Sequence, residues 1–187
     1  MKPIKTSIML AVTLALSLQS AQAADWAFFP VVSDDYQFAP QLSLITGNIN
    51  PGDAKNGSLT GLELAINCPL LKAPEGVIRQ QISFARYDEN GLEISTFELN
   101  PHYQIEIAEN LDFGFGPGFG YISADGGNLD DSSITLQAGA SLSYHIDQVV
   151  IGAEARYQTL LSDMKTTNGS EVDIDNTRIM LKLGYQF

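Results

Sequence analysis

The strongest constraint on the fold is a strict alternation of residue types along the last ten positions of the chain. Apolar or aromatic residues occupy every second position from 179 to the terminal Phe187, and the positions between them carry Arg178, Met180, Lys182, Gly184 and Gln186. Residues 132–146 repeat the pattern. A helix would mix the two sets, because its period is 3.6 residues. The alternation therefore predicts β-strands with one apolar and one largely polar face.

Eight stretches of this kind follow one another, separated by turn residues. They cover residues 39–49, 58–68, 76–87, 93–107, 111–122, 132–146, 149–160 and 178–187. An even number of antiparallel strands places both chain ends on one side, as in bacterial single-chain barrels. We therefore predict an all-β fold, an eight-stranded antiparallel up-and-down transmembrane β-barrel with its apolar faces outward. The alternative is a soluble eight-stranded sandwich or lipocalin-like fold, which would place the same apolar faces inside.

The connections predict the orientation of the barrel. Short links at 108–110 and near Asp147 are typical of periplasmic turns, whereas 50–57, 123–131 and 162–173 are longer and predict external loops. Two connections fit less well: 69–75 is long for a periplasmic turn, and Asn90-Gly91 signals a tight turn at an external position. Pro117 cannot donate a ladder hydrogen bond, so we expect a bulge or bend there.

The first 23 residues have the pattern of a secretory signal peptide. Lys2 and Lys5 form a positive region, residues 8–18 are mainly apolar, and Ala21 and Ala23 occupy the positions that a signal peptidase reads. The apolar run is too short to span a bilayer as a helix, which needs about 20 residues. We expect cleavage after Ala23. An exported chain with no later membrane-spanning helix can still enter a membrane as a closed barrel.

The alternating strands and the ending Leu183-Gly184-Tyr185-Gln186-Phe187 resemble the small outer-membrane β-barrel superfamily, which includes the outer membrane protein A membrane domain and the opacity-type porin-like proteins. The resemblance covers the whole mature chain and lies in pattern more than in a diagnostic motif. It implies a location in the outer membrane of a Gram-negative bacterium. It also implies that Leu181, Leu183, Tyr185 and Phe187 form a C-terminal insertion signal for the outer-membrane insertion machinery. The family often has Gly where this chain has Lys182.

The predicted inward face carries charges of both signs. These are Glu63, Arg79, Glu98, Glu106, Glu154, Arg156, Arg178 and Lys182. A charge in a narrow lumen requires partners, because isolated burial costs several kcal/mol. Eight-stranded barrels are just wide enough to be filled by side chains. We therefore predict an ion-paired network that fills the lumen, with a narrow polar path or gated channel as the alternative.

A catalytic site is not expected. Lipid A deacylases of this size pair a His with a Ser two residues later, whereas here His102 is followed at that spacing by Gln104, and His145 by Asp147. Both histidines are interpreted as polar lumen or rim residues. Two His and one Cys are too few for the usual zinc sites, so neither metal nor cofactor is predicted.

Acidic residues dominate the predicted external loops. Removing the signal peptide leaves eight Lys and Arg against 22 Asp and Glu, a net charge of −14, which disfavours nucleic acid as a partner. The loop acids are Asp53, Asp88, Glu89, Asp125, Asp130, Asp131, Asp163, Glu171, Asp173 and Asp175. They predict a solvated rim, with divalent-cation bridging to lipopolysaccharide phosphates as a sharper hypothesis.

Residues 24–38 contain more aromatic side chains than a linker needs: Trp26, Phe28, Phe29, Tyr36 and Phe38. Two roles fit this segment. It could be an anchor at the inner interface of the membrane that holds the barrel, where Trp and Tyr concentrate, or it could be part of a plug. We therefore divide the chain into a signal peptide (1–23), a periplasmic or interfacial segment (24–38) and the barrel (39–187). Cys68, the only cysteine, has no disulfide partner within the chain.

Three functions remain in order of preference. The first is a structural or surface-interaction barrel without catalysis, whose partners are outer-membrane lipids, lipopolysaccharide and an extracellular ligand bound by the acidic loops. The second is a narrow porin-like channel for small solutes. The third is a lipid-modifying membrane enzyme.

Overall fold

Eight long antiparallel strands close into a barrel in the computed structural model, which describes residues 26–52, 55–89 and 91–187. The barrel strands are β2 (Gln41–Pro51), β3 (Gly57–Asn67), β5 (Val77–Glu89), β6 (Leu92–Ala108), β7 (Leu111–Gly126), β8 (Leu129–Ile146), β9 (Val149–Leu160) and β12 (Asn176–Gln186). Each pairs with its neighbours in sequence, and β12 closes the barrel against β2. The predicted fold class is confirmed. The predicted signal peptide lies outside the described residues.

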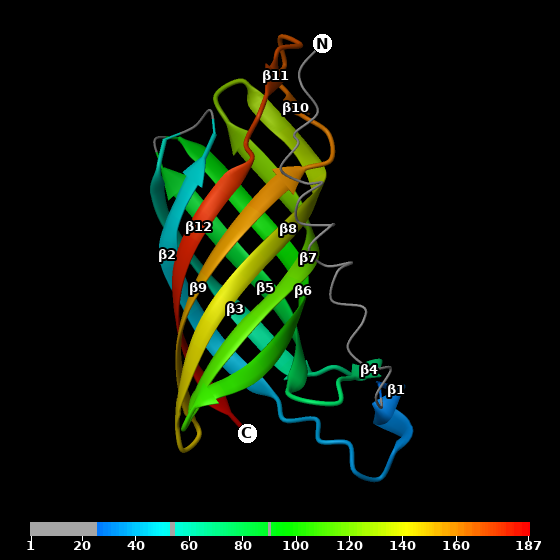
Figure 1. The fold of residues 1–187 in the computed structure, drawn as a ribbon. Coiled ribbons are helices and arrows are strands. Elements are labelled where there is room, and N and C mark those ends of the chain that lie inside the picture. Colours follow the sequence, from blue (N-terminus) through cyan, green and yellow to red (C-terminus); the bar gives the residue numbers. More distant parts are fainter. Residues whose placement is uncertain (1–25, 53–54, 90) are drawn as a thin grey trace.

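Both ends of the barrel sequence lie at the lower end of the barrel in Figure 1, with the two-residue turns at 109–110 and 147–148. The opposite end carries the connection between β9 and β12. There β10 (Met164–Lys165) and β11 (Glu171–Val172) form a small ribbon that rises above the barrel (Figure 1). In outer-membrane barrels, short turns lie on the periplasmic side, so we refer to the lower end as the periplasmic end and to the opposite end as the external end. Within the described parts of the chain, no helix is long and apolar enough to cross a membrane.

One predicted external loop differs from the structure. Residues 123–131 are mostly strand, because β7 and β8 extend to Gly126 and Leu129 and meet in a tight turn in which Gly127 has φ of 62°. Only glycine adopts this backbone conformation without strain. The expected external loop 162–173 lies in the long connection between β9 and β12, and the β10–β11 ribbon forms part of it. Gly126-Gly127 marks the turn between β7 and β8 in the sequence, within the longer loop expected there.

The bulge expected at Pro117 is wrong. The β7–β8 register runs through Pro117 without a shift and pairs it with Ala138. The register shift that does occur lies on the other side of β7, between Glu106 and Ala108 of β6. Pro117 therefore avoids a bulge because its missing N–H is directed away from β8.

The backbone nitrogen of Pro117, which carries no hydrogen, is directed toward β6, where the opposite residue is also a proline. The pairing of β6 with β7 skips three consecutive positions of β6, 100–102, and resumes in the same register. That register places Pro101 directly opposite Pro117. Neither residue has an N–H, so both hydrogen bonds of this pair are absent and both carbonyl oxygens lack a ladder donor. We call this interruption the proline seam.

Apolar side chains cover the outside of the barrel and polar side chains fill most of its inside. Leu44, Ile134 and Leu183 are 61%, 57% and 55% exposed, whereas inward residues such as Glu98 and Arg178 are 1% exposed. This is the reverse of a soluble protein, where large contiguous apolar surface is avoided. The soluble sandwich or lipocalin-like alternative is therefore wrong, and the outer surface requires an apolar surrounding such as a bilayer.

Candidate functional site

The middle of the lumen is filled by six charged side chains, three acidic and three basic. Glu98 Oε1 lies 2.6 Å from Arg178 Nη1, and Glu98 also forms an ion pair with Arg156. Arg156 pairs in addition with Glu154. Lys182 Nζ lies 2.5 Å from a Glu154 oxygen and 2.6 Å from a Glu63 oxygen. The ion-pair layer, as we call these six residues, therefore forms one connected and electrically neutral network.

Side-chain amides complete the ion-pair layer. Gln158 donates to Thr135 Oγ1 at 2.9 Å and accepts from Asn176 at 2.9 Å. Gln137 donates to Asn100 Oδ1 at 2.7 Å and accepts from Arg178 at 3.1 Å. Because most hydrogen-bonding groups at this level have partners, the network stabilises a filled lumen rather than a wide polar passage.

Above the ion-pair layer, toward the external end, the lumen is closed by apolar side chains. Ile49, Leu59, Ile94 and Ile122 are each 0% exposed, and Met164 from β10 packs with them. The cluster, which we call the apolar cap, consists of Ile45, Ile49, Leu59, Ala85, Tyr87, Ile94, Ile122, Ala124, Leu129, Met164, Ile174 and Met180. Two of these residues reach down alongside the ion-pair layer, because Met180 lies between Arg178 and Lys182 on β12 and Ile45 pairs with Lys182. Ile174, from the segment before β12, is also fully buried in it. At this level the lumen is therefore lined mainly by apolar side chains.

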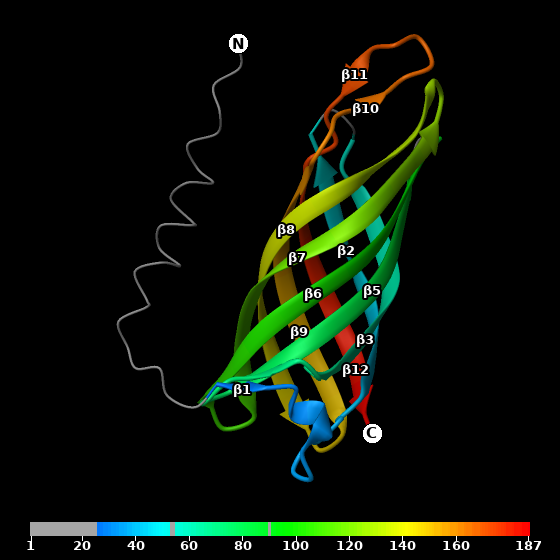
Figure 2. The same ribbon diagram turned by 90° about the vertical axis from the view of Figure 1, so that its right-hand side faces the viewer.

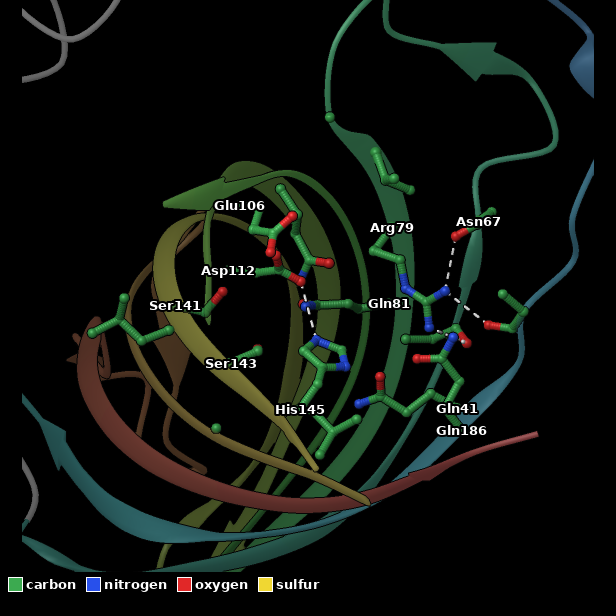
Figure 3. Close-up of a pocket in the computed structure, with 18 of the residues that line it drawn as sticks. Gln41, Asn67, Arg79, Gln81, Glu106, Asp112, Ser141, Ser143, His145 and Gln186 are labelled. Carbon is green, nitrogen blue, oxygen red and sulfur yellow. Dashed lines mark hydrogen bonds and ion pairs between the residues drawn. The ribbon is translucent and has the colours of Figure 1, made fainter. Parts of the chain in front are cut away.

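Below the ion-pair layer, the lumen opens to the periplasmic end as a cavity of about 580 Å³. Polar side chains line it from several strands, and Figure 3 shows Asp112 and His145, from the neighbouring strands β7 and β8, pointing toward each other in it. His145 Nε2 lies 3.0 Å from Asp112 Oδ2. Glu63 and Lys182 form its inner end. The lumen thus has three levels: an open polar vestibule, the ion-pair layer and the apolar cap.

The structure brings six of the eight predicted lumen charges together in the ion-pair layer. Arg79 is also buried but lies apart, and it donates to Asn67 Oδ1 at 2.8 Å and to the Ala39 carbonyl at 2.7 Å (Figure 3). Glu106 lies at the periplasmic mouth, is exposed, and accepts a hydrogen bond from the Asn110 N–H at 3.3 Å. Arg79 therefore fixes the chain entering the barrel, and Glu106 takes no part in the network.

The four residues of the predicted insertion signal are all exposed on the outside, three of them on β12 and Phe187 directly after it. Leu181, Leu183, Tyr185 and Phe187 are 61%, 55%, 43% and 72% exposed. The rings of Tyr185 and Phe187 meet edge to face with centroids 5.0 Å apart. These four side chains therefore form an exposed apolar row on the outside of the barrel.

The apolar cap was not predicted from the sequence. Its members occupy inward positions, which we expected to be polar. A signal was present, because residues 42–49 are apolar on both faces, with Leu42 and Leu44 outward and Ile45 and Ile49 inward. Loss of alternation in a strand of a membrane barrel indicates a dry interior at that level.

The two histidines occupy different levels. His102 is buried in the wall, and its Nδ1 lies 3.5 Å from Ser141 Oγ. His145 pairs with Asp112 on the neighbouring strand β7. Among the described residues, no group of three His, Cys, Asp or Glu side chains is placed to hold a metal ion.

An apolar exterior of closed antiparallel strands around a polar interior defines a transmembrane β-barrel. Comparison with known proteins places it more narrowly. No family model and no curated protein sequence matches the chain. Among solved structures, it is similar to Neisserial surface protein A (TM-score 0.58, 13% identity, covering 80% of this chain and 97% of that one).

Two further structures show the same likeness. The N-terminal β-barrel domain of Pseudomonas aeruginosa OprF gives a TM-score of 0.55 at 12% identity, covering 81% of this chain and all of that one. Ail, the attachment invasion locus protein of Yersinia pestis, gives 0.51 at 16% identity, covering 80% and 97%. The chain therefore has the fold of the small outer-membrane barrels, which confirms the resemblance noted in its sequence.

Proposed function

We propose that this protein is a closed structural or surface-interaction barrel of a Gram-negative outer membrane, exported by a signal peptide cleaved after Ala23. The observation that carries the proposal is the double closure of the lumen. A solute entering from the periplasmic vestibule meets the ion-pair layer, in which Glu98 and Arg178 are 1% exposed, and then the apolar cap. An ion crossing both would have to break buried ion pairs and then shed its water.

Planar-bilayer recording tests this proposal against the narrow channel. The refolded protein should shift in mobility between unboiled and boiled gels, which shows an intact barrel, and should give no discrete conductance steps. As a positive control, replacing Ile49, Ile94 and Ile122 together by Ser should weaken the closure and raise the rate of transient openings. Regular steps from the unaltered, folded barrel would contradict a closed lumen and support a channel.

The external rim points to the class of surface partner. Among the described residues at this end, Asp125, Asp130, Asp163 and Glu171 are exposed, and only three basic residues, Lys55, Arg86 and Lys165, lie nearby. Arg86 is already paired with Glu93 at 2.5 Å. We infer that the rim binds cationic ligands, or lipopolysaccharide phosphates through bridging divalent cations.

A neighbour of similar fold makes the contrast clear. Ail has been solved in complex with the heparin analogue sucrose octasulfate (TM-score 0.50, 16% identity). A polysulfated ligand would be repelled by the acidic rim of the present barrel. Binding of purified lipopolysaccharide to the barrel with magnesium, and its loss with a chelator, would support the bridging role. Binding that is indifferent to the chelator would contradict it.

A further inference from the structure

An apolar structure projects sideways from the periplasmic end of the barrel. It consists of residues 26–36 and 69–73, with β1 (Ala27–Phe28), η2 (Pro30–Val32) and β4 (Leu71–Lys72), and we call it the foot. Figure 1 shows it beside the lower end of the barrel, displaced from the wall, and Figure 2 shows it in front of that wall. It lies outside the lumen, so the plug considered for residues 24–38 is not formed by the described part of this segment.

The foot exposes several large apolar side chains within a short segment. Phe28, Phe29 and Val32 are 74%, 58% and 84% exposed. The full set is Trp26, Phe28, Phe29, Val31, Val32 and Leu70. A cluster of this kind on a surface in water is unfavourable and marks an interaction site.

The chain holds these side chains in place with many specific contacts. β1 pairs with β4, and the Phe29 N–H donates to the Leu70 carbonyl at 2.8 Å. Lys72 Nζ lies 2.8 Å from Asp35 Oδ2, which joins the two halves of the foot. Phe29 also adopts a φ of 55°, a conformation that costs a bulky residue energy and persists only when its surroundings enforce it. The foot is therefore a built structure rather than a loose tail.

The foot is also fixed to the barrel. Tyr36 donates to the Asn67 carbonyl at 2.7 Å, and Asn67 Nδ2 donates to the Gln37 carbonyl at 2.7 Å. Arg79 then holds the Ala39 carbonyl at the barrel entrance. These contacts set the height and direction of the foot relative to the lipid-facing wall. The groove between foot and wall reaches Val77 and Ile78, at the lower edge of that wall.

We propose that the foot sits in the headgroup region of the periplasmic leaflet, with its apolar side chains among the phospholipids next to the barrel. Three observations select lipid as the occupant. The foot lies at the level of the barrel's periplasmic end and beside its wall. It exposes large apolar side chains there. It also carries Trp26 and Tyr36, whose residue types concentrate at membrane interfaces. The inference rests on the proposed membrane location of the barrel.

Trp26 provides a direct test, because it is the only tryptophan in the chain. The full mature protein is refolded into phosphatidylcholine vesicles in which some lipids carry bromine either near the headgroup or near the acyl-chain end. We expect strong quenching of Trp26 emission by the shallow bromines, weaker quenching by the deep ones, and a several-fold reduction in quenching by aqueous iodide relative to the unfolded chain. The gel-mobility shift on the same samples reports separately that the barrel has inserted.

Matched variants separate lipid contact from other burial. Phe28→Ser combined with Val32→Ser removes apolar surface without removing any side-chain hydrogen bond, so shallow-bromine quenching should fall several-fold while the gel shift remains. Leu161→Ser, at a residue 60% exposed at the opposite end, should leave Trp26 unchanged.

Each remaining outcome counts against the proposal. Free access of iodide to Trp26 in an inserted barrel would show that the foot stays in water. Protection from both iodide and bromine would show a protein contact, such as a second copy of the chain. A missing gel shift would contradict the membrane location of the barrel, and therefore also the proposed position of the foot in the periplasmic leaflet.

Discussion

Arg178 and Glu98 meet at 2.6 Å from opposite walls of the barrel. Their strands, β12 and β6, lie four steps apart in a ring of eight, so this ion pair spans the whole diameter of the lumen. Glu98 also pairs with Arg156 from β9, the neighbour of β12, so one carboxylate on β6 is linked to two adjacent strands of the opposite wall. Backbone ladders connect each strand only to the next one, whereas this pair connects the two sides directly.

Removing the cross-lumen pair should destabilise the barrel strongly. Arg178→Met leaves the ion-pair layer with a net charge of −1, and the loss of one partner of a buried pair costs about 3–5 kcal/mol. Urea unfolding in lipid vesicles measures this. Arg178→Met combined with Glu98→Gln leaves two acidic and two basic residues, with Arg156 still paired with Glu154, so the layer is neutral again and part of the loss should be recovered.

The control is a surface pair of the same chemistry. Arg86 and Glu93 lie 2.5 Å apart but are 51% and 40% exposed, so Arg86→Met should cost no more than about 1 kcal/mol. Equal effects of Arg86→Met and Arg178→Met would show that the buried network carries no special weight in stability.

Alternation along the chain predicted the fold and which residues point into the lumen. It did not predict the height in the lumen at which each of these residues lies. Glu98, Arg156 and Arg178 were assigned inward correctly because strand geometry alone decides which face a residue occupies. Which inward residues meet depends on the tilt and stagger of all eight strands, which a single segment does not encode. Glu106 illustrates this: it has the correct parity, yet its position near the end of β6 places it at the mouth.

The apolar cap shows a second limit. Ile45 and Ile49 share β2 with the outward Leu42 and Leu44, so the alternation there is weak, and the strand was recognised less clearly than β8 or β12. The same loss of contrast hid the cap. The proline seam was hidden for another reason, since Pro101 and Pro117 become neighbours only once the β6–β7 register is known.

Truncation of the apolar cap should cost more than truncation of the lipid-facing wall. Leu59 and Leu62 both lie on β3, but Leu59 is 0% exposed in the cap and Leu62 is 50% exposed on the outside. Leu59→Ala leaves a cavity and should cost about 2–5 kcal/mol. Leu62→Ala should cost less, because lipid chains fill the space. Equal costs by urea unfolding would indicate that the cap is loosely packed.

The C-terminal edge should govern assembly rather than stability. Phe187→Ala removes an aromatic residue that is 72% exposed and contacts Tyr185, so the folded barrel loses little. We expect fewer heat-modifiable barrels in cells and an unchanged refolding yield into vesicles in vitro. Leu161→Ala serves as a control. A defect of equal size in both assays would assign Phe187 to the fold instead of to the insertion machinery.

Relief of the proline seam should stabilise the barrel. Pro117→Ala supplies an N–H that the Pro101 carbonyl can accept, and a hydrogen bond of this kind contributes about 0.5–1.5 kcal/mol. Pro74→Ala, in the exposed link before β5, controls for the greater freedom that any lost proline gives the unfolded chain. Unfolding midpoints should therefore rank Pro117→Ala above Pro74→Ala. The reverse order would mean that the seam is already satisfied by other donors.

Strong acid should loosen the foot. The hydrogen bond from Lys72, with a smaller contribution from Ser33, lowers the pKa of Asp35 from 3.8 to about 2. A carboxyl with a depressed pKa in the folded state stabilises that state above its unfolded pKa, and this contribution is lost as pH falls from about 4 to about 2. Iodide quenching of Trp26 in detergent should rise over this range. Asp35→Asn should abolish the transition, and an unchanged transition in that variant would assign it to another group.

The three levels of the lumen make the protein electrically one-sided. Periplasmic water reaches inward as far as Glu63 and Lys182, whereas the apolar cap at the other end is dry. A voltage across the membrane therefore falls mainly over the ion-pair layer and the cap, because an aqueous vestibule conducts while a low-dielectric region does not. The electric field inside the barrel is therefore strongest at the side chains of the ion-pair layer and the apolar cap, which are the side chains that close the lumen.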